Sequence, residues 1–176
     1  MRTSRLLAIL LGACWLLLPL TAGAGTVTFT SGKDALLQGM GAFKGGYYEQ
    51  AIPALERAAE DNEFLALYYL ARIYSDNTGS FTNHGKAYAL FQKIVDEYAD
   101  LDPDEDSRAP LVGKSLTALA GYVRNGLAEI GLKPDLSRSI EYLHNASVIF
   151  NDEDAQFELA KLQLTGEGVE ENVPKA

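Results

Sequence analysis

Apolar residues recur along residues 64–100 with the spacing of two antiparallel helices. In both FLALYYLARIY and KAYALFQKIVDEYA they fall at i, i+3, i+4 and i+7, the pattern of a helix that buries one side. The inward positions are Ala66, Leu70, Ala71, Tyr74, Ala87, Leu90, Phe91, Ile94, Val95 and Tyr98. Between the two halves, DNTGSFTNHG is polar and rich in turn-forming residues. The stretch therefore predicts one helical hairpin.

The same design recurs on both sides of this hairpin. Helical spacing predicts hairpins over 33–61, with a tight turn at Gly45-Gly46, and over 109–151, and an incomplete copy over 154–176. Their predicted apolar faces include Leu36, Leu37, Met40 and Phe43, then Ala51, Leu55, Ala58 and Ala59, and later Ile140, Leu143, Ala146 and Ile149. The second helices of the first two hairpins are offset by 36 residues, which is typical of helical repeats. We predict an all-α solenoid of antiparallel helical hairpins, and the early end is expected of a piece of a longer repeat protein.

The first 24 residues have the pattern of a secretory signal peptide. A basic start, MRTSR, precedes the apolar run LLAILLGACWLLLPL and the small residues A-G-A, so we predict cleavage between Ala24 and Gly25. A membrane anchor is the alternative, but the run is short for a span. A lipoprotein box ending at Cys14 is another, but WLLLPL would then follow the cysteine in place of a polar tether. Residues 25–32 are expected to form an extended lead-in.

The net charge narrows the classes of partner, and the cysteine content bears on disulfides. Once Arg2 and Arg5 leave with the signal peptide, 13 basic residues face 24 acidic ones, a net charge of −11. Such a protein repels phosphate backbones and anionic membrane surfaces, so we expect no nucleic-acid partner and no stable membrane insertion after cleavage. Cys14 is the only cysteine, so the exported chain is predicted to contain no disulfide.

An acidic segment, 96–108, interrupts the repeat rhythm and is predicted to be an exposed insertion. Seven of its residues are acidic, and Pro103 prevents a helix from continuing. The alternating aspartates resemble the start of a calcium loop, but Glu105 and Leu111 occupy the positions of the required glycine and bidentate acid. Crowding of like charges is expected to raise the pKa of some of these carboxyl groups.

The repeat pattern is similar to that of the Sel1-like repeats, which belong with the tetratricopeptide solenoids. The resemblance rests on A-x-x-x-L-A followed by the loop Gly166-Glu167-Gly168-Val169, and it covers nearly all of 33–176; the loop at 76–85 departs from it. Together with the signal peptide, GMGAFKGGYYEQAIPALERAAE and the acidic insertion before ALAGYVRNG resemble the ExoR-type family of alphaproteobacteria. That resemblance implies a periplasmic negative regulator of exopolysaccharide production that binds and inhibits a sensor histidine kinase. It also implies release of the kinase by acid-promoted proteolysis, for which Asp102, Asp104, Glu105 and Asp106 are acid-sensing candidates.

No arrangement of residues predicts catalysis or a cofactor. His84 and His144 lie a whole repeat apart, so they are expected to be surface side chains, with a pH switch as the alternative. Neither H-x-x-x-H, H-E-x-x-H, G-x-S-x-G nor a phosphate-binding glycine loop occurs, so we predict no metal, no cofactor and no enzyme.

Protein binding remains as the predicted mode of action. In helical-hairpin solenoids the first helix of each hairpin lines the concave surface, which makes Tyr69, Arg72, Arg124 and Lys161 candidate contacts. The partner implied by the resemblance is the periplasmic domain of a sensor kinase. A general envelope scaffold is the alternative. A third hypothesis is hydrolysis of β-lactam-type ligands, as in some exported Sel1 proteins, but those are rich in disulfides.

Overall fold

The computed structural model describes residues 28–168, and that part of the chain is helical. It contains α1 (Gly32–Lys44), α2 (Tyr48–Glu60), α3 (Phe64–Ser75), α4 (His84–Tyr98), α5 (Ala109–Asn125), the short 3₁₀ helix η1 (Ala128–Ile130), α6 (Leu136–Val148) and α7 (Glu153–Thr165). The predicted all-α class is confirmed. The predicted signal peptide, its cleavage site and the start of the lead-in lie outside the described residues.

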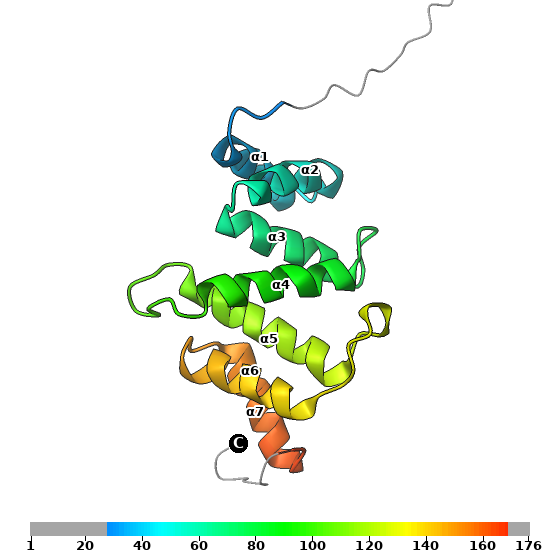
Figure 1. Cartoon of the computed structure of the whole chain (residues 1–176), viewed down its shortest axis with the longest axis vertical. Coiled ribbons are helices and arrows are strands. Elements are labelled where there is room, and N and C mark those ends of the chain that lie inside the picture. The colour runs from blue at the N-terminus through cyan, green and yellow to red at the C-terminus, as the bar shows by residue number, and fades with distance from the viewer. Residues whose placement is uncertain (1–27, 169–176) are drawn as a thin grey trace, which may run out of the picture.

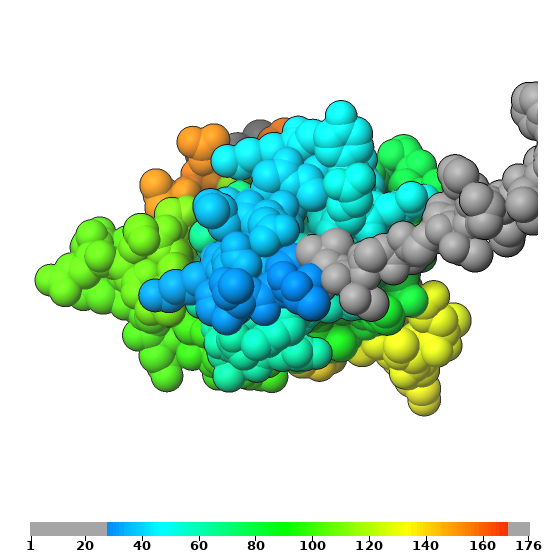
Figure 2. Space-filling view, turned by 90° about the horizontal axis from the view of Figure 1, so that it is seen from above, coloured from blue at the N-terminus to red at the C-terminus, as the bar shows by residue number. Residues whose placement is uncertain are grey.

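The helices stack along the long axis of the molecule, from α1 at one end to α7 at the other (Figure 1). Helices α1 and α2, α3 and α4, and α5 and α6 form three hairpins, and each hairpin packs on the next through α2 against α3, α4 against α5, and α6 against α7. Viewed along the stack, the loop between α4 and α5 projects on one side and the loop between α5 and α6 on the other (Figure 2). First helices also contact one another, α1 with α3 and α5 with α7, so the array has one face built on the first helices and another built on the second helices.

The core follows the predicted apolar faces and is densest around α3, which packs between neighbours on both sides. Ala66, Leu70 and Ala71 are at most 2% exposed, as are Phe91 and Ile94 of α4. Full burial of one such large side chain contributes about 1.5–3 kcal/mol to the free energy of unfolding. Burial between consecutive helices therefore fixes the order of the stack.

Two residues predicted to face inward do not. Leu37 is 75% exposed because Ala35 and Gly39 form the buried face of α1, and a residue two positions away points to the opposite side of the helix. Ile149 is 47% exposed because α6 ends at Val148, and the chain turns away there before Phe150 re-enters the core. Helical spacing alone assigned both residues to the wrong side.

Side-chain caps set where several helices begin. The side chains of Ser31, Asn83, Asp135 and Asp152 accept hydrogen bonds from backbone amides in the first turns of α1, α4, α6 and α7. Asp152 also accepts a 2.7 Å hydrogen bond from the hydroxyl of Thr117 and lies 3.6 Å from the ammonium group of Lys114. This buried carboxylate therefore positions α7 against α5.

Candidate interaction groove

Four adjoining hollows run along the first-helix face, and we call them together the first-helix groove. Their volumes are about 480, 380, 390 and 250 Å³, in order from the side of α1 to the side of α7. Adjacent hollows share lining residues: Arg72 and Ser75 line the first and second, Ser75 and Ala118 the second and third, and Gly121 and Asn125 the third and fourth. The groove therefore extends over three successive repeats.

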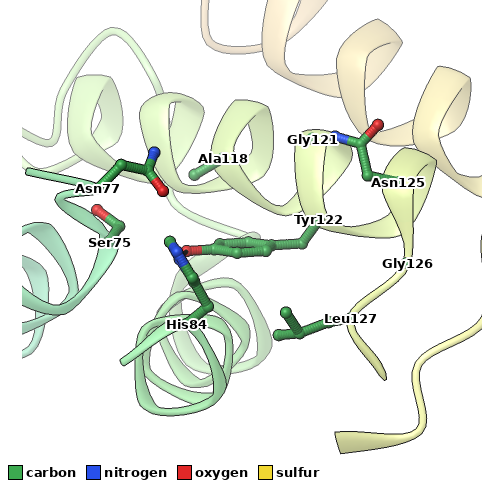
Figure 3. Close-up of a pocket in the computed structure, with 9 residues that line it drawn as sticks. All are labelled: Ser75, Asn77, His84, Ala118, Gly121, Tyr122, Asn125, Gly126 and Leu127. Carbon is green, nitrogen blue, oxygen red and sulfur yellow. Dashed lines mark hydrogen bonds between the residues drawn. The ribbon is translucent and has the colours of Figure 1, made fainter. Parts of the chain in front are cut away.

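Small side chains on α5 keep the middle of this groove open. Gly121 lies inside α5, and a Cβ atom built there would meet no heavy atom within 4 Å. Glycine inside a helix lowers stability by about 1 kcal/mol relative to alanine. Because the space around Gly121 is open, no packing contact explains why glycine occupies this position. Ala118, one turn earlier, continues the same bare strip (Figure 3). An approaching chain can thus contact the backbone of α5 closely.

The cations that line the groove differ in how they are neutralised. Lys114 lies 3.6 Å from both Asp152 and Asp154. Arg124 lies 2.7 Å from Glu167 and 3.7 Å from Glu158.

Arg72 is different. Among residues 28–168 it has no carboxylate within ion-pair distance, and its guanidinium lies 3.4 Å from the hydroxyl of Tyr68 and 6.0 Å from the centre of that ring. Arg72 is therefore the groove cation available to an incoming acidic group.

A histidine–tyrosine contact forms one wall of the groove. Nδ1 of His84, at the first position of α4, lies 2.9 Å from the phenolic oxygen of Tyr122 on α5 (Figure 3). Burial raises the pKa of Tyr122 to about 12, with a smaller contribution from the charge of Glu129. The expectation that both histidines are surface side chains is wrong for His84, which is half-buried, whereas His144 is exposed. Sequence spacing offered no signal for the contact, because its partners come from different repeats.

The predicted binding residues occupy different places. Arg72 and Arg124 line the groove. Tyr69 is half-buried against the ring of Phe43, with centroids 4.7 Å apart, and is not among the residues lining the four hollows. Lys161 is exposed on α7, where it pairs with Glu158 at 2.8 Å. Arg124 and Lys161 thus converge on one glutamate, and their role in binding stays a prediction.

The acidic insertion is tied to the array by Arg108. The guanidinium donates to both carboxylate oxygens of Asp106, at 2.9 and 2.7 Å, and lies 5.0 and 5.8 Å from the ring centres of Tyr98 and Phe64. These hydrogen bonds lower the pKa of Asp106 to about 2, opposite to the rise expected from crowding. Asp106 is therefore ionised at any mildly acidic pH. Asp102, Asp104 and Glu105 lie on the exposed part of the insertion.

Between residues 28 and 168, no three His, Cys, Asp or Glu side chains are grouped so that they could hold a metal ion. No helix in that range has the length and apolar character needed to cross a bilayer.

Known proteins resemble this chain in sequence. The Sel1 repeat family model matches residues 65–97, 114–147 and 153–176. Two curated relatives are named "Exopolysaccharide production negative regulator". The one from Rhizobium meliloti (strain 1021) is 33% identical over 88% of this chain and 56% of its own length, and the one from Rhizobium leguminosarum bv. viciae is 30% identical over 82% and 53%. The chain thus spans about half the length of these relatives.

Among solved structures, the crystal structure of a Sel1 repeat protein from Oxalobacter formigenes is similar at 17% identity. The similarity covers 82% of this chain and 69% of that one, with a TM-score of 0.38.

Proposed function

Because this chain belongs to the Sel1 repeat family, we propose that it acts by binding another protein along the first-helix groove, and not by catalysis. The groove is continuous over three repeats, it contains a cation, Arg72, with no carboxylate at ion-pair distance in the described chain, and its floor includes the bare backbone at Gly121. An extended surface built from several repeats suits recognition of a polypeptide. The open strip at Gly121 is the observation that carries this proposal.

We further propose that the bound partner belongs to the control of exopolysaccharide production, which the chain would restrain. The support is the similarity to two negative regulators over more than four fifths of the chain, including α3, α4 and α5, which build the groove. In the finer form of the proposal, the chain is exported, cleaved between Ala24 and Gly25, and holds the periplasmic domain of a sensor histidine kinase inactive.

Measurement of exopolysaccharide in complemented strains tests the regulatory role. A bacterial strain that lacks its own copy of the protein is complemented with this chain or with Arg72→Glu, and secreted exopolysaccharide is quantified. The chain is expected to lower exopolysaccharide, and the charge reversal to lose most of that effect while circular dichroism and the amount of protein stay unchanged. Equal exopolysaccharide with and without the chain would contradict the regulatory role.

Capture of partners separates the regulator from a general envelope scaffold. Affinity capture from a periplasmic extract is expected to recover a kinase sensor domain with the unmodified chain and much less of it with Arg72→Glu. Recovery of envelope assembly proteins alone, with no kinase, would favour the scaffold.

Acid sensing by the insertion is a separate proposal that involves Asp102, Asp104 and Glu105. Asp106 does not fit that role, since its low pKa keeps it charged under mild acid. Replacing the three exposed acids by Asn or Gln is expected to reduce acid-induced proteolysis of the chain. Replacement of Asp106 alone serves as the comparison. Proteolysis that is unchanged in the triple variant would refute the role of this segment.

A further inference from the structure

The opposite face of the molecule has a hollow of its own between α2 and α4, and we call it the α2–α4 trough. Its volume is about 490 Å³. The floor comes from α3, where Leu67, Leu70 and Tyr74 lie at i, i+3 and i+7. The trough shares no lining residue with the first-helix groove. It is therefore a separate surface.

The corresponding space between α4 and α6 is bridged by the protein's own side chains. The phenolic oxygen of Tyr142 lies 3.4 Å from Gln92 on α4, and Arg138 donates to the same oxygen at 2.6 and 3.1 Å. The guanidinium also lies 5.2 Å from the centre of the Tyr142 ring. These contacts span the gap between the two second helices.

The α2–α4 trough stays open because α4 has a shorter side chain at the matching position. The buried residues Ala87, Phe91 and Ile94 of α4 match Ser139, Leu143 and Ala146 of α6, so Leu90 stands where α6 has Tyr142. Leucine is shorter than tyrosine, and Leu90 lines the trough together with the small side chain of Ala59 on α2. Leu67 and Leu70 are buried beneath the trough, and its accessible apolar lining comes from Ala59, Ala89 and Leu90.

One end of the trough is closed by a cluster around Tyr74. The Tyr74 hydroxyl donates to Glu56 at 2.9 Å, and the ammonium group of Lys86 lies 4.9 Å from the centre of the Tyr74 ring and 4.0 Å from Glu56. At the other end, Lys93 of α4 donates a 3.2 Å hydrogen bond to the side chain of Asn62, just beyond the end of α2. A ligand in the trough therefore lies between the Tyr74 cluster and the end marked by Glu60 and Lys93.

The two rims of the trough carry opposite charge. On α4, Lys86 and Lys93 are seven residues apart, about 10 Å or two helical turns. On α2, Glu56 and Glu60 lie one turn apart. At the end opposite the Tyr74 cluster, Glu60 is 72% exposed and 3.5 Å from Arg57, and Lys93 lies 3.8 Å from Glu97 and 3.2 Å from Asn62. Both charged groups still face solvent.

We propose that the α2–α4 trough seats a short amphipathic helix of a partner protein. Its apolar face lies on Ala59, Ala89 and Leu90, an acidic flank lies beside Lys93, and a basic flank lies beside Glu60. A helix fits because the trough runs between two helices, as in helix-in-groove recognition. Opposite charges on the two rims fix the direction of the bound helix. This site is independent of the first-helix groove.

Three stapled helical peptides with the same apolar stripe test the proposal by fluorescence anisotropy with the full chain. One has Glu on one flank and Lys on the other, the second has Lys on both flanks, and the third has Glu on both. The mixed peptide is expected to bind the unmodified chain most tightly. Lys93→Glu should shift the preference to the all-Lys peptide, and Glu60→Lys to the all-Glu peptide. Equal binding of the three peptides, or no shift in either variant, would overturn the proposal.

A variant whose own side chain fills the trough provides a second test of the proposal. Leu90→Tyr places in α4 the side chain that bridges the next gap, and it should weaken the mixed peptide at least about tenfold. Gly121→Trp, which fills the first-helix groove, should leave this affinity within about twofold. Unchanged binding to Leu90→Tyr, or a loss in Gly121→Trp, would place the peptide elsewhere. Should Leu90→Tyr fail to fold by circular dichroism, the two exposed charge variants decide the question by themselves.

Discussion

The imidazole Nδ1 of His84 lies 2.9 Å from the phenolic oxygen of Tyr122, although 38 residues separate the two in the chain. The contact joins the start of α4 to α5, and the amide of Gly85 donates to Glu129 beside it. Two repeats are thereby held in register at the wall of the first-helix groove. The shape of the groove depends on this contact between repeats.

Removing the hydroxyl at position 122 should loosen the junction between the second and third hairpins. Tyr122→Phe leaves His84 without its partner, and a hydrogen bond of this kind contributes about 0.5–1.5 kcal/mol. Urea unfolding should register that loss, and hydrogen exchange should accelerate at the start of α4. Tyr47→Phe, at an exposed tyrosine, serves as the control. Equal stability and exchange in the two variants would show that the contact does not hold the repeats.

Two glycines of α1 should respond oppositely to the same substitution. A Cβ at Gly39 would lie 2.8 Å from Leu55 side-chain atoms and 3.1 Å from the Leu55 amide nitrogen, whereas one at Gly41 would meet nothing within 4 Å. Gly41→Ala should stabilise the chain by about 0.5–1 kcal/mol through helix propensity. Gly39→Ala should destabilise it by about 1 kcal/mol, because the overlap with α2 exceeds that gain. Thermal unfolding of both variants measures the contrast, and stabilisation by both would refute the close approach of α1 and α2.

Filling the groove should abolish partner binding without unfolding the protein. Gly121→Trp places a large side chain where a Cβ meets open space, so its effect on the free energy of unfolding should be within about 1 kcal/mol. Capture of the partner should fall at least about tenfold. Gly41→Trp introduces the same side chain at another open helical glycine, outside the groove, and should bind normally. Loss of binding in both variants, or in neither, would remove the groove from the proposed function.

The pair of Asp106 and Arg108 should stabilise the chain at neutral pH and lose that effect in strong acid. The folded-state pKa of Asp106 is lowered to about 2 from 3.8, so its contribution is present above 3.8 and disappears as the pH falls through 2. Asp106→Asn should therefore melt at a lower temperature than the unmodified chain at pH 7, and the two should converge between pH 4 and 2.

Arg108→Gln supplies the comparison for that pH series. It removes the same ion pair, and it also loses the contacts over the rings of Phe64 and Tyr98. A difference from the unmodified chain should therefore persist at the lowest pH. A gap between Asp106→Asn and the unmodified chain that does not change with pH would contradict the lowered pKa.

The buried cap of α7 should matter more than an exposed cap of the same type. Asp152→Ala removes the cap, leaves Thr117 without its carboxylate and leaves Lys114 with Asp154 alone, for a loss of about 2–3 kcal/mol. Asp135→Ala removes the exposed cap of α6, for about 1 kcal/mol. Urea unfolding gives both values. Equal losses would mean that Asp152 acts only as a cap.

The amino-acid sequence by itself determined that the chain is a stack of helical hairpins. Helix formation and the side that a helix buries are local properties, and they repeat visibly in residues such as Ala66, Leu70 and Ala71 or Ala155, Leu159 and Ala160. That is also why the resemblance to the Sel1 repeats could be seen in the sequence. Helical spacing assigned the wrong side to Leu37 and Ile149. Leu37 lies on a helix with few neighbours, and Ile149 lies where a helix ends.

Only the tertiary structure decided which side chains from different repeats meet. The contact of His84 with Tyr122, the open strip at Gly121 and the low pKa of Asp106 depend on distances between segments that helical period does not specify. The same holds for the binding candidates: spacing placed Tyr69 and Arg72 on one helix, and packing put the first against Phe43 and the second in the groove. The helical period determines which side of each helix is apolar. Contacts between helices then determine which side chains remain free to bind.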